Sequence, residues 1–195
     1  MTDDDDARAV LGAVLARAGQ EGFSPALLTS VQGDAVFPAG IAAVVAFWAS
    51  EIDAALEQQL VAMELAALPV RARIRVGVLS RLALLKPHKD AARKAALLPQ
   101  ALGDSATSLW HTADIIWRAA GDRSTDFNFY SKRAILAAVL SSTMVAWFGD
   151  DSDDERHTAA FLDARIDNVL AYEKLKARFK QACANSTAPQ SGNAS

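Results

Sequence analysis

Helical periodicity, broken at intervals by proline and glycine, is the feature that most constrains how this chain of 195 residues can fold. About a fifth of the residues are alanine, the strongest helix former, and the alternation that strands require is nearly absent. Hydrophobic residues make up 51% of the chain, which is too many for a disordered protein. The sequence therefore predicts an all-α protein, and its length fits a single domain with a well-filled core.

Capping residues and helix breakers divide the chain into about nine expected helices. The first two cover 7–19 and 25–33, and the next segment begins at 37 and runs through Trp48 into a long helix that ends before Pro69. Another helix ends before Pro87, and those that follow cover 89–98, 104–120 and 127–148, with a last helix beginning near 152. Residues 134–140 are apolar all round, so we expect them at the centre of the fold. One domain over 1–184 is expected, followed by a disordered polar tail over 185–195.

Charge is unevenly distributed, although the net charge is only −3. Between Ala18 and Val70 there is no lysine or arginine, whereas the segment from Arg71 to Lys94 is basic with a single acid, Asp90. The simplest interpretation of this basic run is a solvated helix face. The alternative is attachment to an anionic membrane surface, where each basic residue contributes about 1 kcal/mol.

No catalytic or metal-binding pattern is apparent. His88, His111 and His157 lie in different segments without a partner at ligand spacing, and the chain has neither a phosphate loop nor a nucleophile elbow. The acidic run at 150–154 lacks the alternating ligands of a calcium loop and is typical of a helix N-terminus. We therefore expect a protein that is not an enzyme and needs no cofactor.

The sequence also carries expectations about location. The acidic start, with Asp3 to Asp6, is unlike a signal or transit peptide, and the uncharged stretch 134–149 is shorter than the about 20 residues of a membrane span. One cysteine, Cys183, allows no internal disulfide. We expect a cytoplasmic protein, with peripheral contact at the inner membrane as an open alternative.

Short N-terminal helices ahead of a longer helical body resemble TetR-type transcription regulators, whose helix-turn-helix would fall in residues 1–48 and whose body would be 49–184. Phosphate contacts supply most of the affinity for DNA, yet this front segment lacks cations beyond Ala18, and Pro38 falls in the expected recognition helix. We therefore expect a degenerate helix-turn-helix and no DNA binding. A regulator with a hydrophobic effector pocket is the alternative.

The segment LWHTADIIWRAAGDRSTDFNFYSKR, from Leu109 to Arg133, closely resembles the signature of the ninth Coq protein family, accessory proteins of ubiquinone biosynthesis. The similarity continues to FLDARI at Phe161–Ile166. The resemblance implies a TetR-like homodimer without catalytic activity that binds isoprenoid lipid or phospholipid. It also implies delivery of a demethoxylated quinone intermediate to the di-iron hydroxylase of the pathway.

The resemblance places partner contacts just after the turn at 121–126, on Asp126, Asn128, Phe129 and Tyr130. Phe129 stands where the family usually has tryptophan. Helical spacing predicts that Phe127, Tyr130 and Ala134 face the core, so Phe129 is the ring expected at the surface. Some members carry an amphipathic membrane helix after the bundle, and the polar residues after Cys183 predict none here.

An apolar helix beside an aromatic-rich one can enclose a hydrophobic tunnel. The residues expected to bind lipid there are Trp117, Arg133, Leu136, Leu140 and Met144. Arg133 has two interpretations, an anchor for a phosphate headgroup or a salt bridge to Asp122, Asp126 or Asp150. A dimer interface is expected on the last two long helices, at Phe148, Leu162, Ile166 and Val169.

Overall fold

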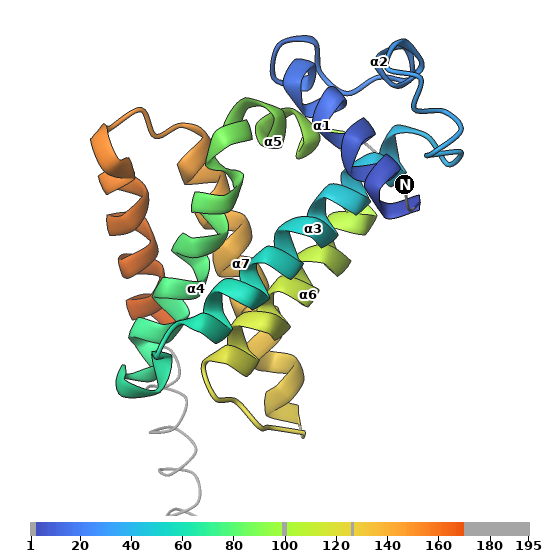
Figure 1. Ribbon diagram of the computed structural model, residues 1–195. Coiled ribbons are helices and arrows are strands. Elements are labelled where there is room, and N and C mark those ends of the chain that lie inside the picture. The colour runs from blue at the N-terminus through green and yellow to red at the C-terminus, as the bar shows by residue number, and fades with distance from the viewer. Residues whose placement is uncertain (1–2, 99–100, 126, 170–195) are drawn as a thin grey trace, which may run out of the picture.

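The computed structural model describes residues 3–98, 101–125 and 127–169. These residues form α1 (Asp3–Glu21), α2 (Pro25–Ser30), α3 (Ile41–Ala62), α4 (Val70–Leu85), α5 (Lys89–Ala95), α6 (Ala101–Ala119) and α7 (Phe127–Phe148) (Figure 1). Short 3-10 turns cover Leu65–Ala67, Lys86–His88 and Asp153–Glu155, and residues 156–169 form a further helix. The described part of the chain contains no strand, so the all-α class is confirmed with slightly fewer helices than nine. The expected tail at 185–195 lies outside the described residues.

The segment expected to begin around Phe37–Pro38 and run through Trp48 becomes helical only at Ile41. Pro38 lies in a turn that ends at Gly40, whose φ of 78° is a conformation that favours glycine, and α3 then runs without interruption from Ile41 to Ala62. The expected boundary at 48/49 therefore falls inside α3. The first helix also begins earlier than expected, at Asp3, because four aspartates in its first turn complement the helix dipole.

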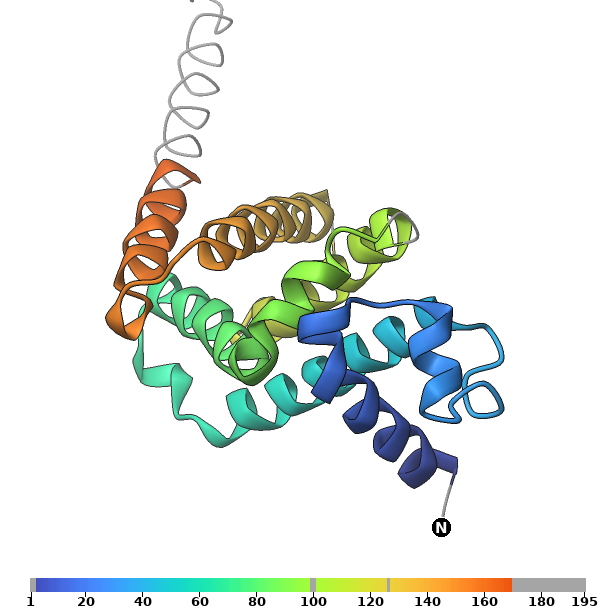
Figure 2. The same ribbon diagram turned by 90° about the horizontal axis from the view of Figure 1, so that it is seen from above.

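Buried side chains form two apolar clusters, and α3 contributes to both. Trp48 belongs to the first cluster, which joins α1, α2, α5 and the first half of α3 to the C-terminal ends of α4 and α7. Leu56 belongs to the second, which joins the rest of α3 to α4, α6, α7 and the helix at 156–169. Seen from above, α1 and α2 lie on the opposite side of the molecule from the helix at 156–169 (Figure 2), and α1 packs against α5. In the described residues no helix is both long enough and apolar enough to cross a membrane.

The helix α7 does not lie at the centre of the fold, contrary to the prediction. Leu136 and Leu140 are buried on its packed face, but Ala134 and Ala138 are exposed, and Val145 is 69% exposed. Periodicity could not reveal this because the segment is apolar all round, whereas packing against α6 covers one side only. The α7 outer face, defined as Tyr130, Ala134, Ala138 and Val145, therefore presents apolar groups to solvent.

The expected dimer residues are engaged within one chain. Leu162 and Ile166 are buried in the second cluster, and Val169 packs against it. Phe148 is half-buried against the first cluster. These side chains fill the monomer core, so they do not supply the free apolar surface that a dimer interface needs.

Each cation of the basic run from Arg71 to Lys94 has an acceptor within the chain. Arg71 and Arg75 pair with Asp167 and Asp163, which joins α4 to the helix at 156–169. The others bind carboxylates or backbone carbonyls: Arg73, Arg81, Lys86, Lys89, Arg93 and Lys94. The run therefore connects helices, and the arrangement gives no support to the membrane-surface interpretation.

Close packing of α4 on α6 depends on Gly77. A Cβ at this position would lie 2.7 Å from Cγ2 and 2.9 Å from Cγ1 of Ile116, a buried β-branched side chain with a stiff χ1. We expect Gly77→Ala to lower the free energy of unfolding by about 1–3 kcal/mol in urea denaturation, because the helices must separate. The control Gly12→Ala, on the exposed side of α1 with no atom within 4 Å of the new Cβ, should raise it by about 0.5–1 kcal/mol. Equal stability of the two variants would contradict this α4–α6 contact.

Candidate functional site

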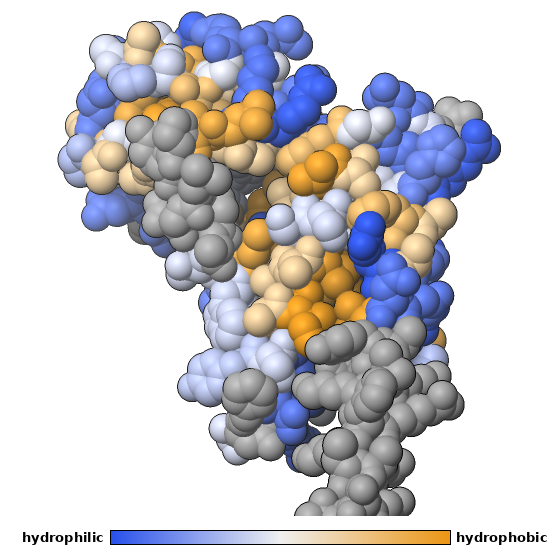
Figure 3. All heavy atoms as spheres, turned by 180° about the vertical axis from the view of Figure 1, so that it is seen from behind, coloured by the Kyte–Doolittle hydropathy of each residue, from blue (hydrophilic) through white to orange (hydrophobic). Residues whose placement is uncertain are grey.

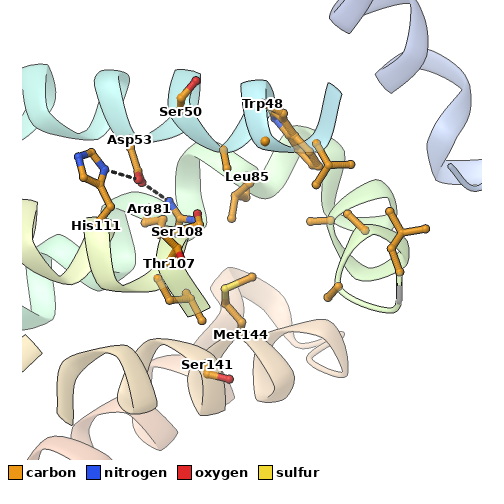
Figure 4. A pocket seen from close by; sticks show the side chains of 18 of the residues that line it. Trp48, Ser50, Asp53, Arg81, Leu85, Thr107, Ser108, His111, Ser141 and Met144 are labelled. Carbon is orange, nitrogen blue, oxygen red and sulfur yellow. Dashed lines mark hydrogen bonds and ion pairs between the residues drawn. The ribbon is translucent and has the colours of Figure 1, made fainter. Parts of the chain in front are cut away.

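A pocket of about 770 Å³ lies between α3, α4, α5, α6 and α7 (Figure 4). Its volume is within the range of about 300–1,000 Å³ that is typical of small-molecule sites. In the space-filling view, hydrophobic side chains gather beside a hollow on one face of the molecule (Figure 3). The pocket is a groove open along one side, because Ala46, Ser50 and Val145 line it and are exposed.

Small side chains create this space. On α3, Ala42, Ala46 and Ala49 recur at i, i+4 and i+7, so they share one helical face, which lines the pocket. Three further alanines line it from α5 and the residue that follows: Ala92, Ala95 and Ala96. Larger apolar side chains complete the wall: Trp48, Leu85, Met144 and Phe148. The walls are therefore mostly apolar, as in sites for hydrophobic ligands.

A buried ion pair lies at one end of the pocket. Arg81 Nη1 donates to Asp53 Oδ1 at 2.5 Å, and the two side chains are only 6% and 4% exposed. The Thr112 hydroxyl donates to the same carboxylate oxygen at 2.7 Å, and His111 Nδ1 lies 3.1 Å from Oδ2. The carboxylate of Asp53 is thus fully engaged by three neighbours from α4 and α6.

The guanidinium of Arg81 is less completely engaged. Its Nε is buried and has no hydrogen-bond partner among the described residues, while Nη1 binds Asp53. Burial lowers the pKa of Arg81 and the neighbouring carboxylate opposes that shift, but a guanidinium stays protonated in proteins. A buried N–H without an acceptor lowers the stability of the fold, so the ion pair with Asp53 is the interaction that holds Arg81 in place.

Of the five residues expected to bind lipid, only Met144 lines the pocket. Leu136 and Leu140 are buried in the second apolar cluster, and Trp117 donates its indole N–H to the carbonyl of Lys132. The sequence placed the cavity beside α6 and the first half of α7. The actual cavity lies further along α7, where α5 and the alanines of α3 leave room.

Arg133 forms internal salt bridges, the second of its two interpretations. It is 2% exposed, and it pairs with Asp114 at 2.7 Å and with Asp122 at 2.9 Å. Burial acts to raise the pKa of Asp122, but hydrogen bonds from Lys132, Ser124 and Arg133 outweigh it and hold this pKa well below its usual range. Of the other proposed partners, Asp150 instead accepts hydrogen bonds from Ser152 and Thr158, and Asp126 lies outside the described residues.

The two rings of the expected partner patch are arranged opposite to the prediction. Tyr130 is 61% exposed, whereas Phe129 is half-buried with its ring centre 3.6 Å from the guanidinium carbon of Arg133. Arg133 pairs with Asp114 of α6 and with Asp122 of the turn, which sets the rotation of α7 and leaves Tyr130 facing outward. Asn128 is exposed, as a partner contact would require.

Sequence reasoning missed Asp53, Arg81 and His111. Two of them left a signal: Asp53 is an acid on the buried face of α3 with Ile52 and Leu56, and Arg81 lies at helical spacing from Val78 and Leu85. A charged residue on a core-facing stripe needs a partner, so each predicts a buried ion pair. The sequence does not show that these two residues pair with each other.

The fold and pocket define the class: an all-helical protein with a largely apolar groove. The described residues contain no cluster of three or more potential metal ligands.

The COQ9 family model matches residues 102–173. Over 100 residues this chain is 39% identical to the rat protein named ubiquinone biosynthesis protein COQ9, mitochondrial. The aligned residues are 50% of this chain and 32% of the rat protein. The human protein of that name is 36% identical over 100 residues, which are 50% of this chain and 31% of the human protein. The probable ubiquinone biosynthesis protein coq9, mitochondrial, of Dictyostelium discoideum is 32% identical over 123 residues, which are 62% of this chain and 39% of that protein.

These similarities confirm the resemblance to the COQ9 family seen in the sequence, over residues 102–173. The aligned segments span about a third of the length of the curated relatives. The matched range contains most of α6 and all of α7, whereas the pocket walls from α3, α4 and α5 precede it. The family match therefore covers one side of the groove only.

Proposed function

We propose that this chain is a non-catalytic accessory protein of ubiquinone biosynthesis that binds isoprenoid lipid or phospholipid in the groove. It presents the quinone intermediate to the di-iron hydroxylase of the pathway. The observation that carries the proposal is the open, mostly apolar pocket of about 770 Å³. The names of the relatives, which are ubiquinone biosynthesis proteins, supply the pathway.

The α7 outer face connects the groove with the proposed partner patch. Val145 lines the groove, and Tyr130 lies 15 residues earlier on the same side of α7. A rise of 1.5 Å per residue separates them by about 22 Å. A hydroxylase seated on Tyr130 would therefore extend along an apolar helix face toward the ligand.

The same groove would suit the effector of a transcription regulator, the alternative raised by the front of the chain. The described α2 and α3 contain no lysine or arginine, so they offer no cation to DNA phosphates. We therefore favour the accessory role, and we propose a homodimer in the cytoplasm, with peripheral contact at the inner membrane as the alternative. The relatives named above are mitochondrial.

Filling the groove tests lipid binding. Ala49→Phe places a ring in the pocket, whereas the control Ala54→Phe places the same ring on the exposed side of α3. We expect mass spectrometry of extracts from the purified proteins to show about tenfold less lipid per chain for Ala49→Phe, since the ring occupies ligand volume. Ala54→Phe should match the wild type. Wild-type extracts free of lipid, or equal yields from both variants, would rule out the groove as the lipid site.

A further inference from the structure

The connection between α3 and α4 is an exposed apolar surface. Residues 61–70, here named the apolar tip, have the sequence VAMELAALPV, in which Glu64 is the only charged or polar side chain. The tip lies at the end of the bundle opposite to α1, α2 and α5 (Figure 1). Its large side chains in contact with solvent are Val61, which is 81% exposed, Met63, Leu68 and Val70. A concentration of exposed apolar groups marks a contact with another protein or with a membrane.

Backbone carbonyls of the apolar tip accept hydrogen bonds from within the chain. The half-buried Arg73 of α4 donates from Nε to the carbonyl of Leu68 at 2.7 Å and from Nη2 to that of Ala66 at 2.8 Å. Further carbonyls of the tip accept backbone N–H groups: Met63, Leu65 and Pro69. A carbonyl without a partner is costly in hydrocarbon, so this bonding lets the tip leave water at a reduced cost.

The small size of the tip indicates what can cover it. A stable protein interface takes about 20–30 residues on each side, whereas the tip is one segment of ten residues. None of these ten residues lines the groove. A bilayer needs no matching protein surface, because binding depends on the apolar area that enters the interface and on attraction to anionic lipids.

Positive charge follows the tip in the chain's arrangement. Arg71, the first residue after the tip, lies 2.8 Å from Asp167, so the helix at 156–169 ends beside the tip. The sequence that continues from there, LAYEKLKARFK at 170–180, contains four cations and one acid. Basic residues close to an anionic lipid surface add to its attraction.

We propose that the apolar tip is a bilayer contact, in which Val61, Leu68 and Val70 enter the interface of an anionic phospholipid membrane. Arg73 acts as a positioning residue that holds the backbone beneath these side chains. The contact is separate from lipid binding in the groove. It also differs from the basic run at 71–94, whose cations have acceptors within the chain.

Co-sedimentation of the full-length protein with vesicles of phosphatidylcholine and phosphatidylglycerol tests the contact. The double substitution Val61→Ser, Leu68→Ser should lower the partition coefficient by roughly tenfold or more, because two aliphatic side chains no longer leave water. The control Leu97→Ser, which changes a side chain that is 77% exposed beyond α5, should bind as the wild type does. Vesicles of phosphatidylcholine alone should bind the wild type more weakly, because the attraction to anionic lipid is lost.

Three results would overturn the contact. The first is equal vesicle binding by the wild type and the double variant. The second is a wild-type dimer that the double variant loses in sedimentation velocity, which would assign the tip to a second copy of the chain. The third is a large fall in melting temperature, because exposed side chains should change stability little.

Ala49→Phe separates this contact from the groove. The variant is expected to lose lipid from the groove but to bind vesicles as the wild type does, since Ala49 lines the groove and not the tip. Loss of vesicle binding in Ala49→Phe would show that vesicles engage the groove, and the tip proposal would fail. Wild-type protein that binds vesicles but yields no extracted lipid would leave the tip in place and overturn the groove alone.

Discussion

Arg133→Met is expected to lower the free energy of unfolding by about 3–5 kcal/mol, because it removes the buried cation between two carboxylates. Arg133 is 2% exposed, and Asp122, one of its partners, keeps a side chain that is 5% exposed. Urea denaturation measures the loss. Arg118→Met is the matched control: Arg118 also pairs with Asp114, but it is 52% exposed, so its loss should cost less than about 1 kcal/mol.

The pH dependence of this difference gives a second readout. The folded pKa of Asp122 is depressed, so its contribution to stability is present above the unfolded value of about 3.9 and is lost as the pH falls. The gap between wild type and Arg133→Met should therefore narrow below pH of about 4. A variant that is fully stable but releases lipid would instead identify Arg133 as a ligand anchor.

Tyr130→Ala should weaken binding of the hydroxylase by about 2–4 kcal/mol, or roughly 30- to 1,000-fold in Kd, if the exposed ring is an interface anchor. Because Tyr130 is 61% exposed, the melting temperature should change little. Phe129→Ala serves as the comparison, since its half-buried ring covers Arg133 and its loss should lower stability first. Titration of the purified hydroxylase measures the affinity, and wild-type affinity in Tyr130→Ala would move the interface elsewhere.

Helix positions followed closely from the sequence because helix formation is largely local. Pro25 and Pro69 begin or precede helices, Gly121 has a positive φ after α6, and α7 was expected with the limits that it has. The error lay at residues 37–40, which form a turn before the helix that starts at Ile41 and continues through Trp48, as expected. The Coq family signature likewise lies in one contiguous stretch, so the sequence could reveal it.

The sequence by itself determined the all-α class, most of the helix limits and the family of the segment from residue 102. Tertiary structure decided which side of α7 is covered, because an apolar segment fits either face and only packing against α6 and the Arg133 salt bridges select one. Tertiary structure also created the polar end of the pocket. Arg81 and His111 follow Asp53 by 28 and 58 residues along the chain. Only the packing of α3, α4 and α6 against one another brings both side chains within hydrogen-bond distance of the Asp53 carboxylate.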